Sequence, residues 1–260
     1  MVTNRIELPF RGDFNWQHML NFYRLRAIKG VEALTEASYS RTVCITGSKA
    51  WFKVTKGENH LELDFEIEDV AKLHTLVTHA RRMLDLDADI CSIERHLNYV
   101  APGLVKRQGI RIPGVWNTWE AGVRAILGQQ VSVKAAIGQL NLLVEKLSVE
   151  GEARCFPEPI DVVNADVSFL RMPQSRKNTL VTFAQFMLDN PQAEPQQWLE
   201  VKGIGPWTVS YARLRGESQP DCFLHNDLVV KKAMQRYPSL NTHTASPWGS
   251  YATFHLWDQS

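Results

Sequence analysis

Several features are scarce or missing in this chain, and each absence removes a class of protein. No run of about eighteen apolar residues occurs, so the sequence predicts no membrane-spanning helix. The first residues, Met1 to Glu7, lack the apolar core of a signal peptide, and we therefore expect a cytoplasmic protein. The four cysteines stand more than forty residues apart, which excludes the close spacing of a zinc knuckle, a redox pair or an iron–sulfur loop.

Net charge of one sign is also missing. The 260 residues include 29 Lys and Arg and 28 Asp and Glu, which gives a formal net charge of +1. This balance argues against nucleic-acid binding through a basic tail and leaves room for a local site. The hydrophobic fraction of 44% is typical of a globular protein with one large core or two smaller ones.

The first part of the chain has the pattern of an α+β unit. Short strands are expected over residues 41–46, 51–55 and 61–67. The last of these alternates apolar and acidic residues, which is typical of an antiparallel strand with one buried face. Helices are expected over residues 15–29 and 67–84, and the second would cover the sheet.

Glycine and proline gather between residues 99 and 114, and beyond this connector the strand pattern largely disappears. Thr118 is expected to cap a helix over residues 118–128. Further helices are expected over residues 133–147, 162–170, 176–188, 195–201, 207–215 and 227–237. The sequence therefore predicts an α+β domain over residues 1–113 and an all-helical domain over residues 114–260.

The segment from Trp198 to Val209 predicts two helices joined by a tight turn. Gly203 and Gly205 flank Ile204 in the turn, and Pro206 suits the first position of the second helix. The two glycines permit positive φ and leave backbone N–H groups bare, so the turn and the helix N-terminus together form an anion site. A plain helix connection is the alternative, but this pattern is typical of a helix–hairpin–helix that binds a DNA phosphate.

Asp227 follows Gly205 by twenty-two residues and opens a helix. An acidic residue in this position is usually a helix cap, and the nearby His225 is more often structural than catalytic. If the hairpin holds a phosphate, however, a carboxylate a short distance away can face an extruded nucleotide.

Together these features resemble the helix–hairpin–helix DNA glycosylase superfamily, and more closely the bacterial 3-methyladenine DNA glycosylases of the AlkA type. The resemblance runs nearly from end to end, through residues 8–22, 120–132, 203–208, 223–227 and 250–257. Its most specific part is the Arg-Ala-Ile-Leu-Gly-Gln run of residues 124–129, followed at this distance by the hairpin.

The resemblance implies an N-terminal antiparallel sheet similar to the TATA-binding-protein fold, followed by an all-helical glycosylase domain. It implies an enzyme of base excision repair that flips 3-methyladenine, 7-methylguanine or a related alkylated base out of double-stranded DNA. The enzyme would hydrolyse the N-glycosidic bond and leave an abasic site, with Asp227 stabilising positive charge on the sugar. Trp207 stands where lyase members carry a Schiff-base lysine, so the resemblance implies hydrolysis without strand cleavage.

The same resemblance implies roles for further residues. An aromatic pocket would stack on the electron-poor base, and the hairpin with the loop after residue 128 would contact DNA. The pocket residues are Phe22, Trp207, Tyr211, Trp257 and Leu228; the DNA contacts are Gly203, Gly205, Thr208, Gln129 and Gln130. The backbone carbonyls of Leu199, Val201 and Ile204 match those that hold a monovalent cation, Na⁺ or K⁺. No catalytic cofactor and no iron–sulfur cluster are implied, and we expect a monomer in the bacterial cytoplasm, on the nucleoid when bound to DNA.

Two residues depart from the family pattern and keep alternatives open. Gln130 stands where the family has an aliphatic wedge, and Leu228 stands where it has a pocket tyrosine. A relative specialised for oxidised or deaminated bases such as hypoxanthine is therefore one alternative. A non-catalytic damage-binding protein is another, although such a protein has no need of the carboxylate of Asp227. A transcription regulator would require a base-reading helix, for which no segment has the composition.

Overall fold

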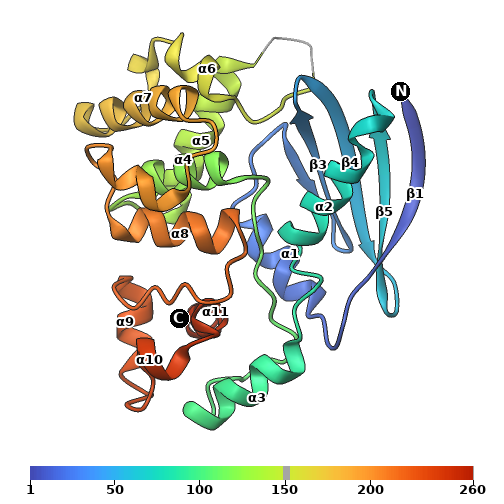
Figure 1. Cartoon of the computed structure of the whole chain (residues 1–260), viewed down its shortest axis with the longest axis vertical. Helices are drawn as coiled ribbons and strands as arrows, with labels where there is room; N and C mark the ends of the chain where they lie inside the picture. The colour runs from blue at the N-terminus through green and yellow to red at the C-terminus, as the bar shows by residue number, and fades with distance from the viewer. Residues whose placement is uncertain (149–152, 260) are drawn as a thin grey trace.

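The computed structural model describes residues 1–148 and 153–259, and Figure 1 shows a sheet on one side of a larger group of helices. Five antiparallel strands form the sheet in the order β1-β5-β4-β3-β2. They are β1 (Val2–Pro9), β2 (Glu32–Leu34), β3 (Ser38–Ile45), β4 (Ser48–Lys56) and β5 (His60–Ile67). The predicted strands are confirmed as β3, β4 and β5. The edge strands β1 and β2 were not predicted, because most residues of β1 are exposed and β2 has only three residues.

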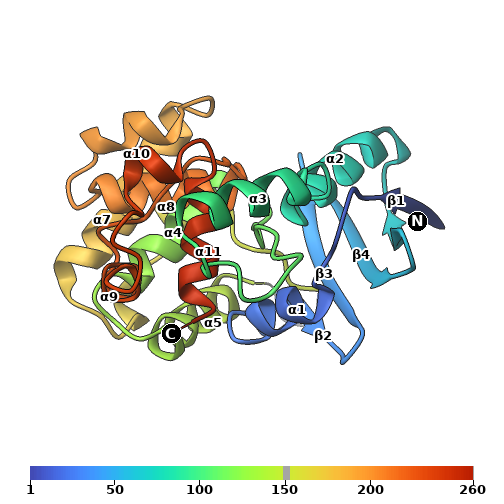
Figure 2. The same ribbon diagram turned by 90° about the horizontal axis from the view of Figure 1, so that it is seen from below.

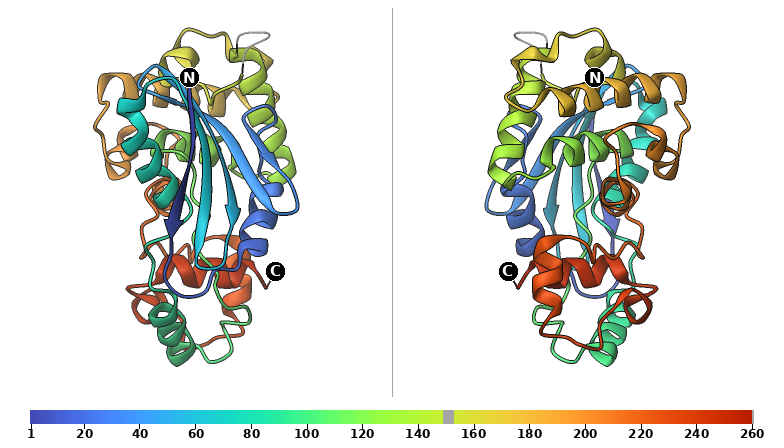
Figure 3. Two further views of the ribbon diagram at one scale, coloured as in Figure 1. Left: turned by 90° about the vertical axis from the view of Figure 1, so that its right-hand side faces the viewer. Right: turned by 90° about the vertical axis from the view of Figure 1, so that its left-hand side faces the viewer.

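One face of the sheet is buried. Every second residue of β5 is buried, including Leu61, Leu63 and Phe65, which confirms the predicted period of two. Helices α1 (Trp16–Arg24) and α2 (Leu73–Met83) pack in this core, while the left panel of Figure 3 shows the strands side by side with no helix in front of them. The predicted helix 15–29 was too long, because the chain turns after Arg24 and Gly30 adopts a φ of +84°.

The remaining elements are helices. They are α3 (Ile90–Val100), α4 (Thr118–Gly128), α5 (Val133–Leu147), α6 (Pro159–Val163), α7 (Gln174–Asp189), α8 (Pro206–Gly216), α9 (Leu228–Met234), α10 (Thr242–Ala245) and α11 (Gly249–Trp257), with 3-10 turns at η1 (Val70–Lys72), η2 (Val167–Phe169) and η3 (Pro195–Glu200). Helices α4 and α5 have the predicted bounds. The predicted cap was wrong by one residue, because the side chain of Asn117, not Thr118, accepts the Glu120 N–H at 2.8 Å. No helix in the described part of the chain is long and apolar enough to cross a bilayer.

Three apolar cores hold these elements together. The first lies between the sheet, α1 and α2, and the second lies among α4, α5, α7 and α8. The third joins α3 and the segment after it to α9 and α11, which lie in the lower part of the molecule in Figure 1, the end that Figure 2 views from below. The predicted domain boundary at residue 113 stays a prediction, and residues 90–112 share their core with the C-terminal helices.

A buried network of four charges connects the sheet to α4. Glu32 and Arg41 come from β2 and β3, while Glu120 and Arg124 come from α4. Arg124 lies 2.9 Å from Glu32 and 2.8 Å from Glu120, and Arg41 lies 2.9 Å from Glu120. All four side chains are buried, so each charge depends on the others for compensation. The network therefore helps to fix the position of the sheet relative to the helices that carry the predicted site.

Candidate active site

The predicted hairpin is formed by η3, residues 201–205 and α8. Pro206 occupies the first turn of α8, as predicted. Gly203 has a φ of +95°, which requires glycine, whereas Gly205 is extended with a φ of −116°, so the prediction of positive φ holds only for Gly203. Ile204 is 7% exposed and packs in the core beside α4 and α7, which fixes the turn to the helices behind it.

Hydrogen bonds from neighbouring helices hold the hairpin in place. The Gln129 amide donates to the Gly203 carbonyl at 3.1 Å and to the Thr208 hydroxyl at 3.3 Å. The Thr179 hydroxyl of α7 donates to the Lys202 carbonyl at 3.0 Å. The side chains of Gln129 and Thr208 thus make hydrogen bonds to other groups of the protein. Thr208 is 2% exposed, so its hydroxyl is not presented to DNA, although the residue lies in the first turn of α8, where backbone N–H groups lack partners within the helix.

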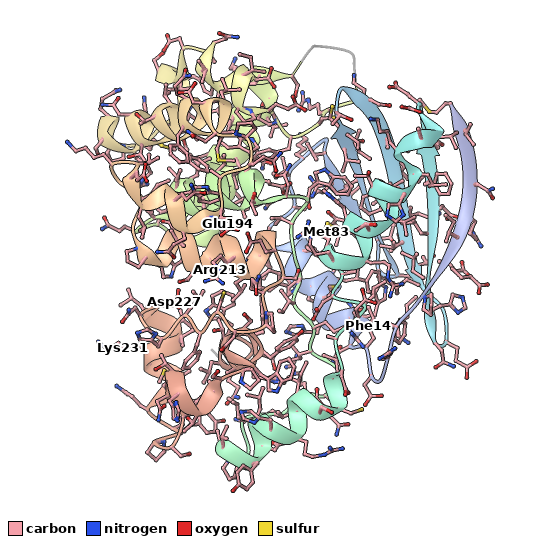
Figure 4. All side chains as sticks on the ribbon, in the orientation of Figure 1. Phe14, Met83, Glu194, Arg213, Asp227 and Lys231 are labelled. Atoms are coloured by element: carbon pink, nitrogen blue, oxygen red, sulfur yellow. The ribbon has the colours of Figure 1, made fainter. Side chains whose placement is uncertain are left out.

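Asp227 stands at the start of α9, facing α8, as Figure 4 shows. Its Oδ1 accepts three hydrogen bonds, from Val229 N at 3.0 Å, Val230 N at 3.2 Å and Trp257 Nε1 at 3.3 Å. The cap interpretation is therefore confirmed, and the carboxylate is also held by an aromatic residue of the predicted pocket, while its catalytic role stays a prediction. Oδ2 receives no hydrogen bond from any residue that the structure describes, so it is the oxygen that can face a substrate.

The predicted aromatic residues form two stacked pairs. Phe22 and Trp257 have ring centroids 6.4 Å apart at 25°, and Trp207 and Tyr211 have centroids 5.2 Å apart at 24°. All four side chains are half-buried. The guanidinium of Arg215 joins the pairs, since its Cζ lies 4.8 Å from the Phe22 ring centre and 5.7 Å from that of Tyr211. A continuous series of contacts thus runs from Asp227 through both pairs.

Two arginines in this region were missed at the sequence level. Arg26 places its Cζ 3.7 Å from the Phe22 ring centre, and Arg215 donates from Nη1 to the Tyr211 hydroxyl at 3.0 Å. Each arginine stands four residues after the aromatic residue that it contacts. That spacing places both side chains on the same helix face when the segment is helical, so it is a usable signal at Arg215 on α8.

The remaining predicted residues lie around the hairpin and the start of α9. Gln130 is exposed, with a φ of +56°, in the turn between α4 and α5, and Leu228 is 83% exposed beside Asp227. The carbonyl of Val201 accepts the Ile204 N–H at 3.0 Å and keeps a second lone pair. Neutral carbonyl oxygens are suitable ligands for Na⁺ or K⁺, so the donor chemistry of Leu199, Val201 and Ile204 fits the predicted cation.

Comparisons with known proteins show what the chain is similar to as a whole. Residues 5–117 match the AlkA N-terminal domain family. The chain is 30% identical over 277 residues to the DNA-3-methyladenine glycosylase 2 of Escherichia coli, covering 96% of this chain and 95% of that protein. It is also 30% identical over 282 residues to a probable bifunctional transcriptional activator/DNA repair enzyme AlkA of Mycobacterium tuberculosis, covering 98% of this chain but only 57% of that longer protein.

The fold has a solved counterpart as well. The 3-methyladenine DNA-glycosylase of Archaeoglobus fulgidus superposes with a TM-score of 0.79 over 98% of this chain and 97% of that one, at 17% identity. An identity this low shows a shared fold and no more. The near-complete match to the Escherichia coli protein goes further, and with it the chain belongs to the AlkA-type family of DNA-3-methyladenine glycosylases.

Proposed function

We propose that this protein is a monofunctional DNA glycosylase that removes alkylated bases such as 3-methyladenine and 7-methylguanine and leaves an abasic site. The observation that carries the proposal is the geometry at Asp227. Three donors hold Oδ1 in place, so Oδ2 has a defined direction beside the aromatic pairs. A carboxylate oriented before the reaction stabilises charge in a transition state without reorganising.

The reaction requires few further groups from the protein. The bond between C1′ and the base nitrogen breaks, its electron pair leaves with the base, and positive charge develops on the sugar. Asp227 stabilises that charge while water adds to C1′ and loses a proton. A base alkylated at N3 or N7 leaves as a neutral molecule, and stacking against Trp207, Tyr211, Phe22 and Trp257 binds it while it is still cationic.

Binding would depend on the DNA backbone. The exposed Gly203, with Gly205 and the first turn of α8, would offer N–H groups to one phosphate, and a monovalent cation on the carbonyls of Leu199, Val201 and Ile204 would add positive charge there. Gln130 would occupy the space left by the extruded base. Trp207 cannot form an imine, so the DNA strand would stay intact, and we propose that the protein acts as a monomer.

The test is release of 3-methyladenine and 7-methylguanine from alkylated duplex DNA. We expect Asp227→Asn to lower the excision rate by about a hundredfold or more, because the amide cannot stabilise positive charge on the sugar. DNA affinity should change little. Asp89→Asn is a matched control, since Asp89 is an exposed cap at the start of α3 and asparagine caps a helix equally well.

The products separate the remaining hypotheses. Released base with an uncut strand supports the monofunctional glycosylase, whereas strand cleavage without heating contradicts the proposed absence of lyase activity. If wild type and Asp227→Asn both bind alkylated DNA and neither releases a base, the protein is a damage-binding protein instead.

A further inference from the structure

A polar contact joins α1 to the end of α11, next to the aromatic pair of Phe22 and Trp257. His18 Nε2 lies 3.5 Å from Asp258 Oδ1, and these two side chains are only 11% and 9% exposed. Arg107, in the segment after α3, lies 3.4 Å from the same carboxylate oxygen. A carboxylate with so little exposure to water requires compensating partners, so this contact constrains how the two helices meet.

The local structure of α11 gives no reason for an acidic residue at position 258. Asp258 ends the helix, where a negative charge opposes the helix dipole. Its backbone N–H already closes the last turn by donating to the Phe254 and Leu256 carbonyls. A nearly buried carboxylate in this position costs stability unless another part of the molecule uses it. The contact with α1 is such a use.

His18 can hold this carboxylate as a neutral imidazole. Burial lowers the pKa of His18 below its ordinary value, although Asp258 opposes the shift, so the ring is uncharged at neutral pH. A neutral imidazole has one N–H, and the buried Nδ1 has no hydrogen-bond partner among the described residues. The proton is therefore best placed on Nε2, the nitrogen beside Asp258. The tautomer that results favours one position of the end of α11 against α1.

The contact lies one residue away from the indole that holds the candidate catalytic carboxylate. Trp257 directly precedes Asp258, and its Nε1 donates to Asp227 Oδ1 at 3.3 Å. Phe22 follows His18 by four residues, so both side chains lie on one face of α1. That face meets the end of α11 at two points, the aromatic stack and the polar contact. A shift at the end of α11 would therefore move the indole relative to Asp227.

We propose that His18 and Asp258 are positioning residues, whose contact between α1 and α11 holds the end of α11 where the Trp257 indole reaches Asp227. The inference rests on the proposed function, since it requires excision at the site of Asp227. Neither positioning residue touches the substrate. Their contact affects the rate of bond cleavage and not the binding of DNA, because it orients a carboxylate that stabilises the transition state.

The experiment compares His18→Leu with His18→Gln in single-turnover excision of 7-methylguanine. Both replacements fill space beside α11, but only glutamine keeps an N–H that can reach Asp258. We expect His18→Leu to lower the maximal rate by about three- to tenfold without changing the DNA concentration at half-maximal rate, and His18→Gln to retain most of the rate. His74→Leu is the matched control, since His74 is an exposed histidine of α2, and it should leave the rate unchanged.

A double-mutant cycle separates positioning from a general effect on stability. If the contact acts through the indole, adding His18→Leu to Trp257→Phe should lower the rate by less than about twofold further. A purely structural role predicts the same loss with and without the indole. Asp258→Ala removes the other side of the contact and should behave as His18→Leu does in both backgrounds.

The outcomes distinguish this inference from the proposed function. If wild type and His74→Leu release no 7-methylguanine, the proposed function fails and the inference fails with it. If they release the base but His18→Leu is as active as wild type, the positioning role is refuted and the glycosylase stands. The same holds if His18→Gln loses as much rate as His18→Leu, or if the loss is equal in the Trp257→Phe background. Should His18→Leu fold poorly, Asp258→Ala gives the same cycle, because removing an acid from the end of a helix favours the helix.

Discussion

At the scale of single side chains, the hydrogen bond that Trp257 donates and the stacking of its ring can be separated by mutation. Its indole Nε1 donates to Asp227 Oδ1 at 3.3 Å, and its ring stacks on Phe22. Trp257→Phe removes the donor and keeps a ring, so we expect excision of 7-methylguanine to fall about tenfold because the carboxylate loses one of its three fixed bonds. Single-turnover kinetics measure this, and the affinity for DNA should stay within about threefold of wild type.

The matched control at this scale is Trp248→Phe, a tryptophan beside α11 that contacts Tyr251 and has no described contact with Asp227. An equal loss of rate in both variants would mean that Trp257 acts only through the stability of α11. An unchanged rate in Trp257→Phe would show that the two backbone N–H groups of α9 are sufficient to orient Asp227.

At the scale of elements, we predict that replacing each of the two hairpin glycines by alanine has a different effect on stability. Gly203 has a φ of +95°, and a Cβ there would overlap Thr179 Oγ1 and lie 3.1 Å from Thr179 Cβ. A Cβ on Gly205 would meet nothing within 4 Å. We expect Gly203→Ala to lower the free energy of unfolding by about 1–3 kcal/mol and weaken DNA binding, because the turn must shift. Gly205→Ala should be close to neutral for stability.

Thermal unfolding and titration of an undamaged duplex measure these two effects. Gly205→Ala serves as the control, because it adds the same methyl group two residues away and retains its N–H. Equal stability of the two variants would contradict the positive φ at Gly203. A DNA affinity of Gly203→Ala equal to that of wild type would contradict the role of the hairpin in phosphate binding.

At the scale of the whole molecule, the four-charge network holds the sheet against the helices. Burial alone would raise the pKa of Glu120, but Arg41 and Arg124 lower it from 4.5 to about 2. A carboxyl with a depressed folded pKa contributes stability above pH 4.5 and loses it as the pH falls toward 2. We expect Glu120→Gln to cost about 3–5 kcal/mol, because it leaves two guanidinium groups buried against one carboxylate.

Denaturant unfolding at pH 7 and across the acid range checks this prediction. In wild type, stability should fall between pH 4.5 and 2, and Glu120→Gln should lose much of this dependence. The control is Glu62→Gln in the exposed pair with Arg5, which should cost at most about 1 kcal/mol. If Glu120→Gln lowers the free energy of unfolding no more than this control does, the network does not stabilise the contact between the sheet and the helices.

The sequence by itself determined the features that depend on local interactions. These features depend on neighbours only a few residues away along the chain. They are the periodicity of α4 and α5, the alternation along β5, the turn at Gly203 with Pro206 after it, and the cap at Asp227. Their signals are therefore visible in a short stretch of chain. The order of the motifs was enough to indicate the family.

Only the tertiary structure decided which distant segments meet. Phe22 of α1 reaches Trp257 of α11, and Arg215 of α8 lies against the same Phe22 ring. The edge strand β1 forms because it pairs with β5, although most of its own residues are exposed. Contacts of this kind are decided by how helices and strands pack, and no short-range pattern encodes them. The family resemblance implied the aromatic residues of the candidate site one by one, while the packing that brings the two pairs together was not predictable.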